Sequence, residues 1–85
     1  MRKIISRDDF RWFNNNTMAV HRADHFVYTL YQQQEEKRWY VVINLCTEFG
    51  LLHNFAKGSG ENFEQALENA RDVAFSFFCE LNAEL

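Results

Sequence analysis

Histidine and cysteine are the residues of this chain best suited to chemistry, but their spacing does not predict a metal site. His21 and His25 are four residues apart, a spacing that fits one face of a helix, yet their segment reads as extended. His53, Cys46 and Cys79 fall on separate predicted elements. Because a zinc site needs three or four convergent ligands, we predict no metal and no cofactor.

Nucleophilic catalysis has no supporting motif either. Ser59 stands between two glycines and reads as a loop serine, with Gly58-Ser59-Gly60 as a flexible approach to the next element. Cys46 alternates onto the strand face opposite the predicted core, and Cys79 is expected on the outer face of a helix among carboxylates, which disfavour a thiolate. The sequence therefore predicts a protein that is not an enzyme.

The composition predicts one folded domain, residues 1–85. Of its 85 residues, 47% are hydrophobic and 16% aromatic, enough for a core, while the length leaves no room for a second one. The basic start at Arg2 and Lys3 has no apolar stretch behind it, so we expect neither a signal peptide nor a membrane span. With only two cysteines, we expect a cytoplasmic protein with free thiols.

The clearest predicted element is a carboxy-terminal amphipathic helix. Its apolar residues recur at the three- and four-residue steps of a helix, namely Phe63, Ala66, Leu67, Ala70, Val73, Ala74, Phe77, Phe78 and Leu81. Asn62 is the expected N-cap, with Gln65 three positions later in a capping-box arrangement.

Three segments before this helix predict strands of an antiparallel meander: residues 25–31, 38–46 and 51–57, each rich in β-branched or aromatic residues. In the second, alternation puts Trp39, Val41, Ile43 and Leu45 on one face, the expected core face. Together with the helix, these strands predict the α+β class.

The amino-terminal third is expected to begin with a helix. Ser6 and Asp9 resemble a capping box that opens a helix over residues 8–13, and Asn14-Asn15-Asn16 ends it. The predicted order is therefore α-β-β-β-α, and residues 17–24 form either a fourth strand or an extended lead-in.

Residues 58–75 resemble the last strand-to-helix passage of double-stranded-RNA-binding domains, in their glycines and in the alanines at 66, 70 and 74. The resemblance implies the same α-β-β-β-α fold. Where that family carries phosphate-binding lysines, however, this chain has Phe63, Glu64 and Leu67. RNA binding through this helix is therefore not expected.

The whole outline, a small acidic domain of sheet and helix, also resembles the accessory proteins of phages, including anti-CRISPR proteins. That resemblance implies an inhibitor or adaptor that acts on a host protein, and we expect it to do so through an acidic helix face or an exposed sheet edge.

The charge distribution selects a candidate binding surface. Residues 61–85 contain six acidic residues and one basic residue, whereas residues 1–60 contain eight basic and six acidic residues. On a helical wheel Glu64, Glu68 and Asp72 form an acidic stripe, and Phe75 projects on the same side. We expect these four residues to bind a basic, nucleic-acid-binding host protein. The alternative for Phe75 is packing beneath the amino-terminal helix.

Two further hypotheses remain open. Nucleic acid is the alternative ligand, held by the scattered basic residues of the first 60 with Trp12 or Tyr40 for stacking: Arg2, Lys3, Arg7, Arg11, Lys37, Arg38 and Lys57. A free sheet edge also permits a homodimer.

Overall fold

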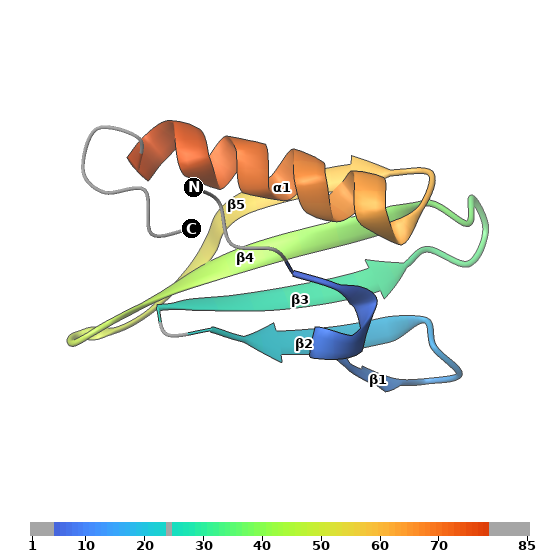
Figure 1. Cartoon of the computed structure of the whole chain (residues 1–85), viewed down its shortest axis with the longest axis horizontal. Helices are drawn as coiled ribbons and strands as arrows, with labels where there is room; N and C mark the ends of the chain where they lie inside the picture. The colour runs from blue at the N-terminus through green and yellow to red at the C-terminus, as the bar shows by residue number, and fades with distance from the viewer. Residues whose placement is uncertain (1–4, 24, 79–85) are drawn as a thin grey trace.

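The computed structural model describes residues 5–23 and 25–78, without the side chains of residues 51–54, 77 and 78. It contains a 3-10 turn η1 (Arg7–Asp9), the strands β1 (Arg11–Phe13), β2 (Met18–Arg22), β3 (Phe26–Gln32), β4 (Trp39–Thr47) and β5 (Gly50–Gly60), and the helix α1 (Phe63–Phe78). The strands form one antiparallel sheet in the order of the chain, and α1 lies along one face of it (Figure 1). The predicted α+β class is confirmed. In the described part of the chain, no helix is long and apolar enough to cross a membrane.

The prediction of an amino-terminal helix over residues 8–13 is wrong. The capping box does form, because the Ser6 backbone N–H donates to Asp9 Oδ2 at 2.8 Å, but it closes only the single turn η1. The chain is extended at Phe10 and continues as β1, so that Phe10 and Trp12, two residues apart, both reach the core. The observed order is thus η-β-β-β-β-β-α rather than α-β-β-β-α.

The strand count also differs from the predicted three. Residues 18–22 form β2, which confirms the alternative of an extra strand, and β1 is a fifth strand that the prediction lacked. Between β1 and β2 the three asparagines Asn14, Asn15 and Asn16 all have positive φ angles of 53° to 62°, a conformation that asparagine adopts more readily than most residues.

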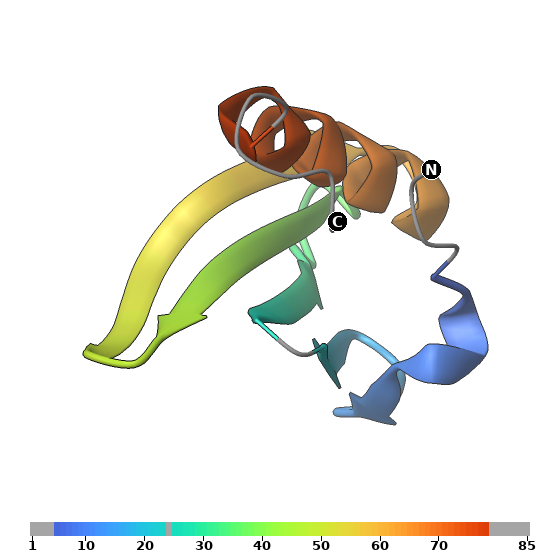
Figure 2. The same cartoon turned by 60° about the vertical axis from the view of Figure 1, so that its left-hand side comes forward.

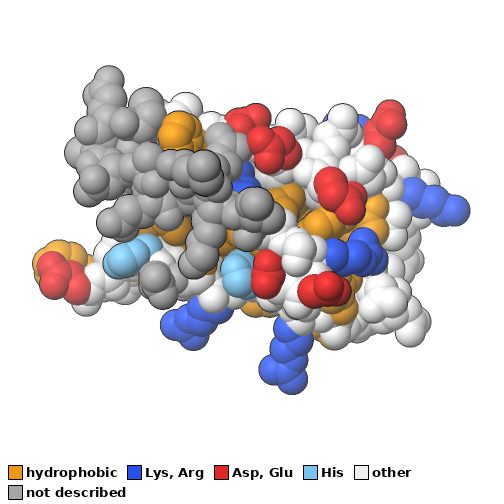
Figure 3. All heavy atoms as spheres, viewed as in Figure 1, with side chains coloured by type: hydrophobic (Ala, Val, Ile, Leu, Met, Phe, Trp, Pro, Cys, Tyr) orange, Lys and Arg blue, Asp and Glu red, His pale blue; other side chains and the backbone are white. Residues whose placement is uncertain are grey.

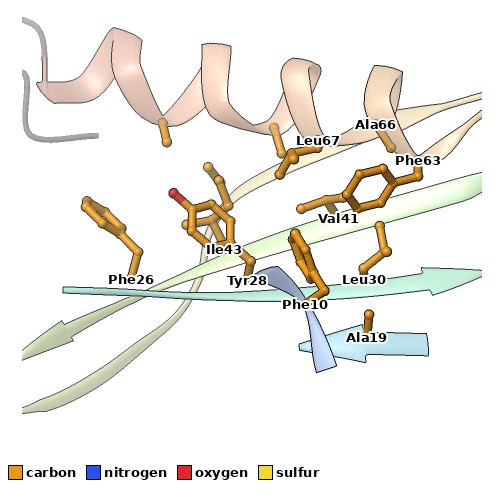
Figure 4. Close-up of a cluster of buried hydrophobic side chains, with 13 residues drawn as sticks. Phe10, Ala19, Phe26, Tyr28, Leu30, Val41, Ile43, Phe63, Ala66 and Leu67 are labelled. Atoms are coloured by element: carbon orange, nitrogen blue, oxygen red, sulfur yellow. The ribbon is translucent and has the colours of Figure 1, made fainter. Parts of the chain in front are cut away.

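The core lies between the sheet and α1. Phe63, Ala66, Leu67, Ala70 and Ala74 of the helix are buried against the inner sheet face, to which Tyr28, Leu30, Val41 and Ile43 contribute the largest fully buried side chains. Figure 4 shows Phe10 among these residues, and its ring meets that of Phe63 edge-on at 5.2 Å. Figure 2 shows the sheet curving around this core, with η1 at the side next to β1. The predicted core face of β4 is confirmed.

Two glycines let α1 approach β5 closely. A Cβ at Gly58 would overlap the Ala70 backbone nitrogen and lie 2.6 Å from Ala70 Cα, and one at Gly60 would lie 2.7 Å from the Ala66 nitrogen. Gly58-Ser59-Gly60, predicted as a loop, is therefore the end of β5, where the helix backbone occupies the space of the missing side chains.

The helix begins as predicted. The Gln65 backbone N–H donates to Asn62 Oδ1 at 2.8 Å, and the Gln65 side chain accepts a hydrogen bond from the Glu61 backbone N–H at 2.8 Å. The second bond reaches one residue beyond the N-cap, a small departure from the predicted capping box. Leu81, at the end of the predicted helix, lies outside the described residues.

Candidate functional site

The predicted acidic stripe lies on the outer side of α1. Glu64, Glu68 and Asp72 are all exposed, and Figure 3 shows acidic side chains over this helix. Arg71 is only 5% exposed, because it lies on the inner side of the helix.

Phe75 differs from the other three predicted residues. Its side chain is partly buried and packs against the hydrophobic core, as does that of Ile5. This position favours the packing role of Phe75 over that of a freely exposed anchor. The acidic helix stripe is therefore taken below as Glu64, Glu68 and Asp72.

A second surface is the outer sheet face, the side of the sheet turned away from α1. Strand pairing aligns residues of all five strands across it in rows. One row, here called the aromatic row, consists of Phe13, Met18, Tyr31, Tyr40 and Ser59. The neighbouring row, here called the basic row, consists of Arg11, Val20, Thr29, Val42 and Lys57.

The aromatic row presents rings to solvent. Phe13 is 42% exposed and Tyr31 is 39% exposed. The rings of Tyr31 and Tyr40 are stacked, with centroids 5.3 Å apart and an angle of 16° between their planes. The Tyr40 hydroxyl donates to Gln33 Oε1 at 3.3 Å, which helps to fix this pair. Phe13 and Tyr31 were not among the stacking residues predicted from the sequence.

The charged strand residues of the outer sheet face are all basic. Arg11 and Lys57 stand at the two ends of the basic row and are exposed, and Arg22 is exposed at the end of β2. Arg38, which precedes β4, donates from Nη2 to Ser59 Oγ at 3.3 Å and so reaches the aromatic row. Among the five described strands, no position is Asp or Glu. In Figure 3 basic side chains project from the side of the sheet where β1 and β2 lie.

Trp12, the other stacking residue suggested by the sequence, faces inward. Its indole packs against Trp39 at 6.1 Å and Phe63 at 5.7 Å between ring centroids, and the Arg7 guanidinium lies 4.2 Å from its ring centroid. The indole N–H donates to the Arg7 carbonyl at 2.9 Å. Trp12 and Arg7 therefore support the core and do not belong to the outer sheet face.

The residues first considered for chemistry are not brought together. His21 stacks on Tyr28 with ring centroids 5.6 Å apart and is half-buried, whereas His25 is exposed. Cys46 is a half-buried free thiol on β4, and Cys79 lies outside the described residues. Among the described residues, no group of three His, Cys, Asp or Glu side chains is placed to hold a metal.

Phe49 is a further exposed aromatic residue. It lies between β4 and β5 and is 93% exposed. The Thr47 hydroxyl accepts a hydrogen bond from the Phe49 backbone N–H at 3.2 Å and donates to the Gly50 carbonyl at 2.9 Å. This turn lies at one end of the long axis of the molecule, apart from both rows of the outer sheet face (Figure 1).

Comparison with protein families, with curated proteins and with solved structures finds no match to this chain. The resemblances to double-stranded-RNA-binding domains and to phage accessory proteins gain no support from these comparisons, and the α-β-β-β-α order that the first of them implied is not the observed one.

Proposed function

We propose that this protein is a small, non-enzymatic binding protein whose outer sheet face binds nucleic acid. The observation that carries the proposal is the combination on one face of exposed aromatic rings and basic side chains, with no carboxylate at any position of the described strands. Phosphate contacts from arginine and lysine supply most of the affinity of nonspecific nucleic-acid binding, and aromatic rings add stacking.

The positions of the basic residues on the outer sheet face support this proposal. The sequence alone suggested a larger and scattered set of basic residues. Arg11 and Lys57 share one row, and Arg38 reaches the neighbouring row through Ser59. Lys37 instead belongs to the turn between β3 and β4, with its backbone carbonyl accepting a hydrogen bond from Gln32 Nε2 at 3.1 Å. Only part of the basic set is therefore available to one ligand at the sheet.

The test compares Lys57→Gln with Lys37→Gln, which remove the same charge on and off the outer sheet face. Binding of labelled mixed-sequence oligonucleotides, single-stranded and duplex, is measured by fluorescence anisotropy over a series of salt concentrations. Lys57→Gln is expected to weaken binding and to reduce the slope of log Kobs against log salt by about 0.7 to 0.9, the value for one phosphate contact, whereas Lys37→Gln leaves the slope unchanged. Absence of binding to every oligonucleotide at low salt would contradict the proposal.

A protein partner on the acidic helix stripe is the second candidate function. The exposure of Glu64, Glu68 and Asp72 favours it, because the described residues of α1 include no basic side chain besides the buried Arg71. The partner would be a basic protein, in line with a phage-type inhibitor of a nucleic-acid-binding host protein. Affinity purification of a tagged copy from the native host identifies such a partner, and recovery of no basic protein counts against this candidate.

A further inference from the structure

The aromatic and basic rows of the outer sheet face point to the form of nucleic acid that it accepts. We infer that this face binds unpaired bases of single-stranded nucleic acid, an inference that rests on the proposed function. The bases stack on Tyr31 and Phe13, while Arg11 and Lys57 contact the phosphates. The two rows are two residues apart along each strand, or about 7 Å. One extended strand can therefore place its bases on the first row and its phosphates on the second.

Ring stacking requires bases whose faces are open. In a duplex the faces are covered by neighbouring base pairs, and a protein reaches only base edges and the backbone. Single-stranded nucleic acid exposes the faces, which aromatic side chains of a sheet can stack. Phe13 on β1 and Tyr31 on β3 lie two strands apart, about 10 Å, so each ring serves a different base.

Two rings of the aromatic row contact each other in the unbound protein. Tyr31 and Tyr40 already stack on each other, and the Tyr40 hydroxyl is bonded to Gln33. A ring held in place loses less side-chain entropy on binding than a freely rotating one. The pair therefore forms a two-ring platform on which a base extends the stack.

The charge of the face selects a polyanion over a second copy of this chain. Two copies meeting through this face would bring Arg11, Arg22 and Lys57 of one chain against the same cations of the other, and no strand position among the described residues supplies a carboxylate to offset them. Like charges brought together at an interface oppose association. A phosphate backbone has the complementary charge.

The experiment measures Kd for a labelled oligothymidine and for a mixed-sequence duplex of equal length at the same salt concentration. The wild type is expected to bind the single strand more tightly. Tyr31→Leu is expected to weaken single-strand binding about 5- to 140-fold, the range for loss of one stacked base, with little change for the duplex. Tyr31→Phe keeps the ring and retains binding.

Phe49→Leu is the matched control, since it removes an exposed ring outside both rows and is expected to leave both Kd values unchanged. Far-UV circular dichroism and thermal unfolding verify that each variant is folded. Equal affinity for single strand and duplex, with no effect of Tyr31→Leu but a loss with Lys57→Gln, would overturn the single-strand inference and leave the proposed function standing. No binding of either oligonucleotide would overturn both.

Discussion

Gly58 is the position in the sheet where one added methyl group is expected to be most damaging. Its missing side chain leaves room for the backbone of α1, and a Cβ there would overlap the Ala70 nitrogen, with Ala66 O at 2.8 Å. These are main-chain atoms of a packed helix, so no side-chain rotation relieves the overlap. Gly58→Ala must push α1 away from β5, where the helix makes its most extensive contact with the sheet.

Gly58→Ala is expected to lower the free energy of unfolding by about 3 kcal/mol or more, the upper end of the range for overpacked cores. A domain of this length has a free energy of unfolding of only about 4 to 13 kcal/mol, so the loss is a large part of the total. Urea denaturation followed by tryptophan fluorescence should show a midpoint lower by about 3 M, for an m-value of about 1 kcal/mol/M. The melting temperature should fall by about 12 to 24 °C.

Ser59→Ala is the control for this experiment, because its side chain lies on the outer sheet face and the substitution is expected to change stability by less than about 0.5 kcal/mol. Ala70→Gly in the Gly58→Ala background should give no rescue, since the overlapping atoms belong to the backbone. A Gly58→Ala variant as stable as wild type, or one rescued by Ala70→Gly, would refute the close approach of helix and strand.

Three other substitutions test separate parts of the structure. Asn62→Ala should cost about 1 kcal/mol in urea denaturation, because Asn62 Oδ1 accepts a hydrogen bond from the Gln65 backbone N–H in the first turn of α1; an unchanged midpoint would exclude the cap. Phe10→Ala should cost about 3 to 5 kcal/mol, because Phe10 is buried against Phe63, and a loss below about 1 kcal/mol would place Phe10 outside the core. Glu68→Lys should weaken binding of a basic partner to the acidic helix stripe in a salt-dependent pull-down, while unchanged binding of an identified partner would eliminate that surface.

The parts of the fold that the sequence predicted well are long and periodic. The apolar spacing from Phe63 onward is local information, and so is the alternation from Trp39 to Leu45 within one strand. The acidic stripe followed from the same helical wheel. The inner position of Arg71 could have been found there too, because it lies four residues after Leu67 and three before Ala74.

The errors came from features whose meaning depends on distant residues. Gly58 and Gly60 read locally as a loop, but they are strand residues whose small size is required by Ala66 and Ala70 of the helix packed above them. The capping box at Ser6 was real but could not show that the helix ends after one turn. Tertiary packing decided both outcomes.

The outer sheet face was harder to predict than the acidic stripe because it requires the register of all five strands. Alternation within a strand shows that Tyr40 faces away from the core. It does not show that Tyr31 lies beside Tyr40, or that Arg11 and Lys57, which are far apart in the sequence, end the same row. An available signal was the lack of acidic residues in the segments that form strands.

Chemical-shift mapping by NMR tests the central claim, nucleic-acid binding by the outer sheet face, most directly. The isotopically labelled protein is titrated with oligothymidine, and the backbone amide shifts are followed residue by residue. Binding by the outer sheet face predicts the largest changes at Phe13, Tyr31 and Lys57, with little change along the outer side of α1. Changes concentrated at Glu68 and its helix neighbours, or no changes at all at saturating oligonucleotide, would contradict it.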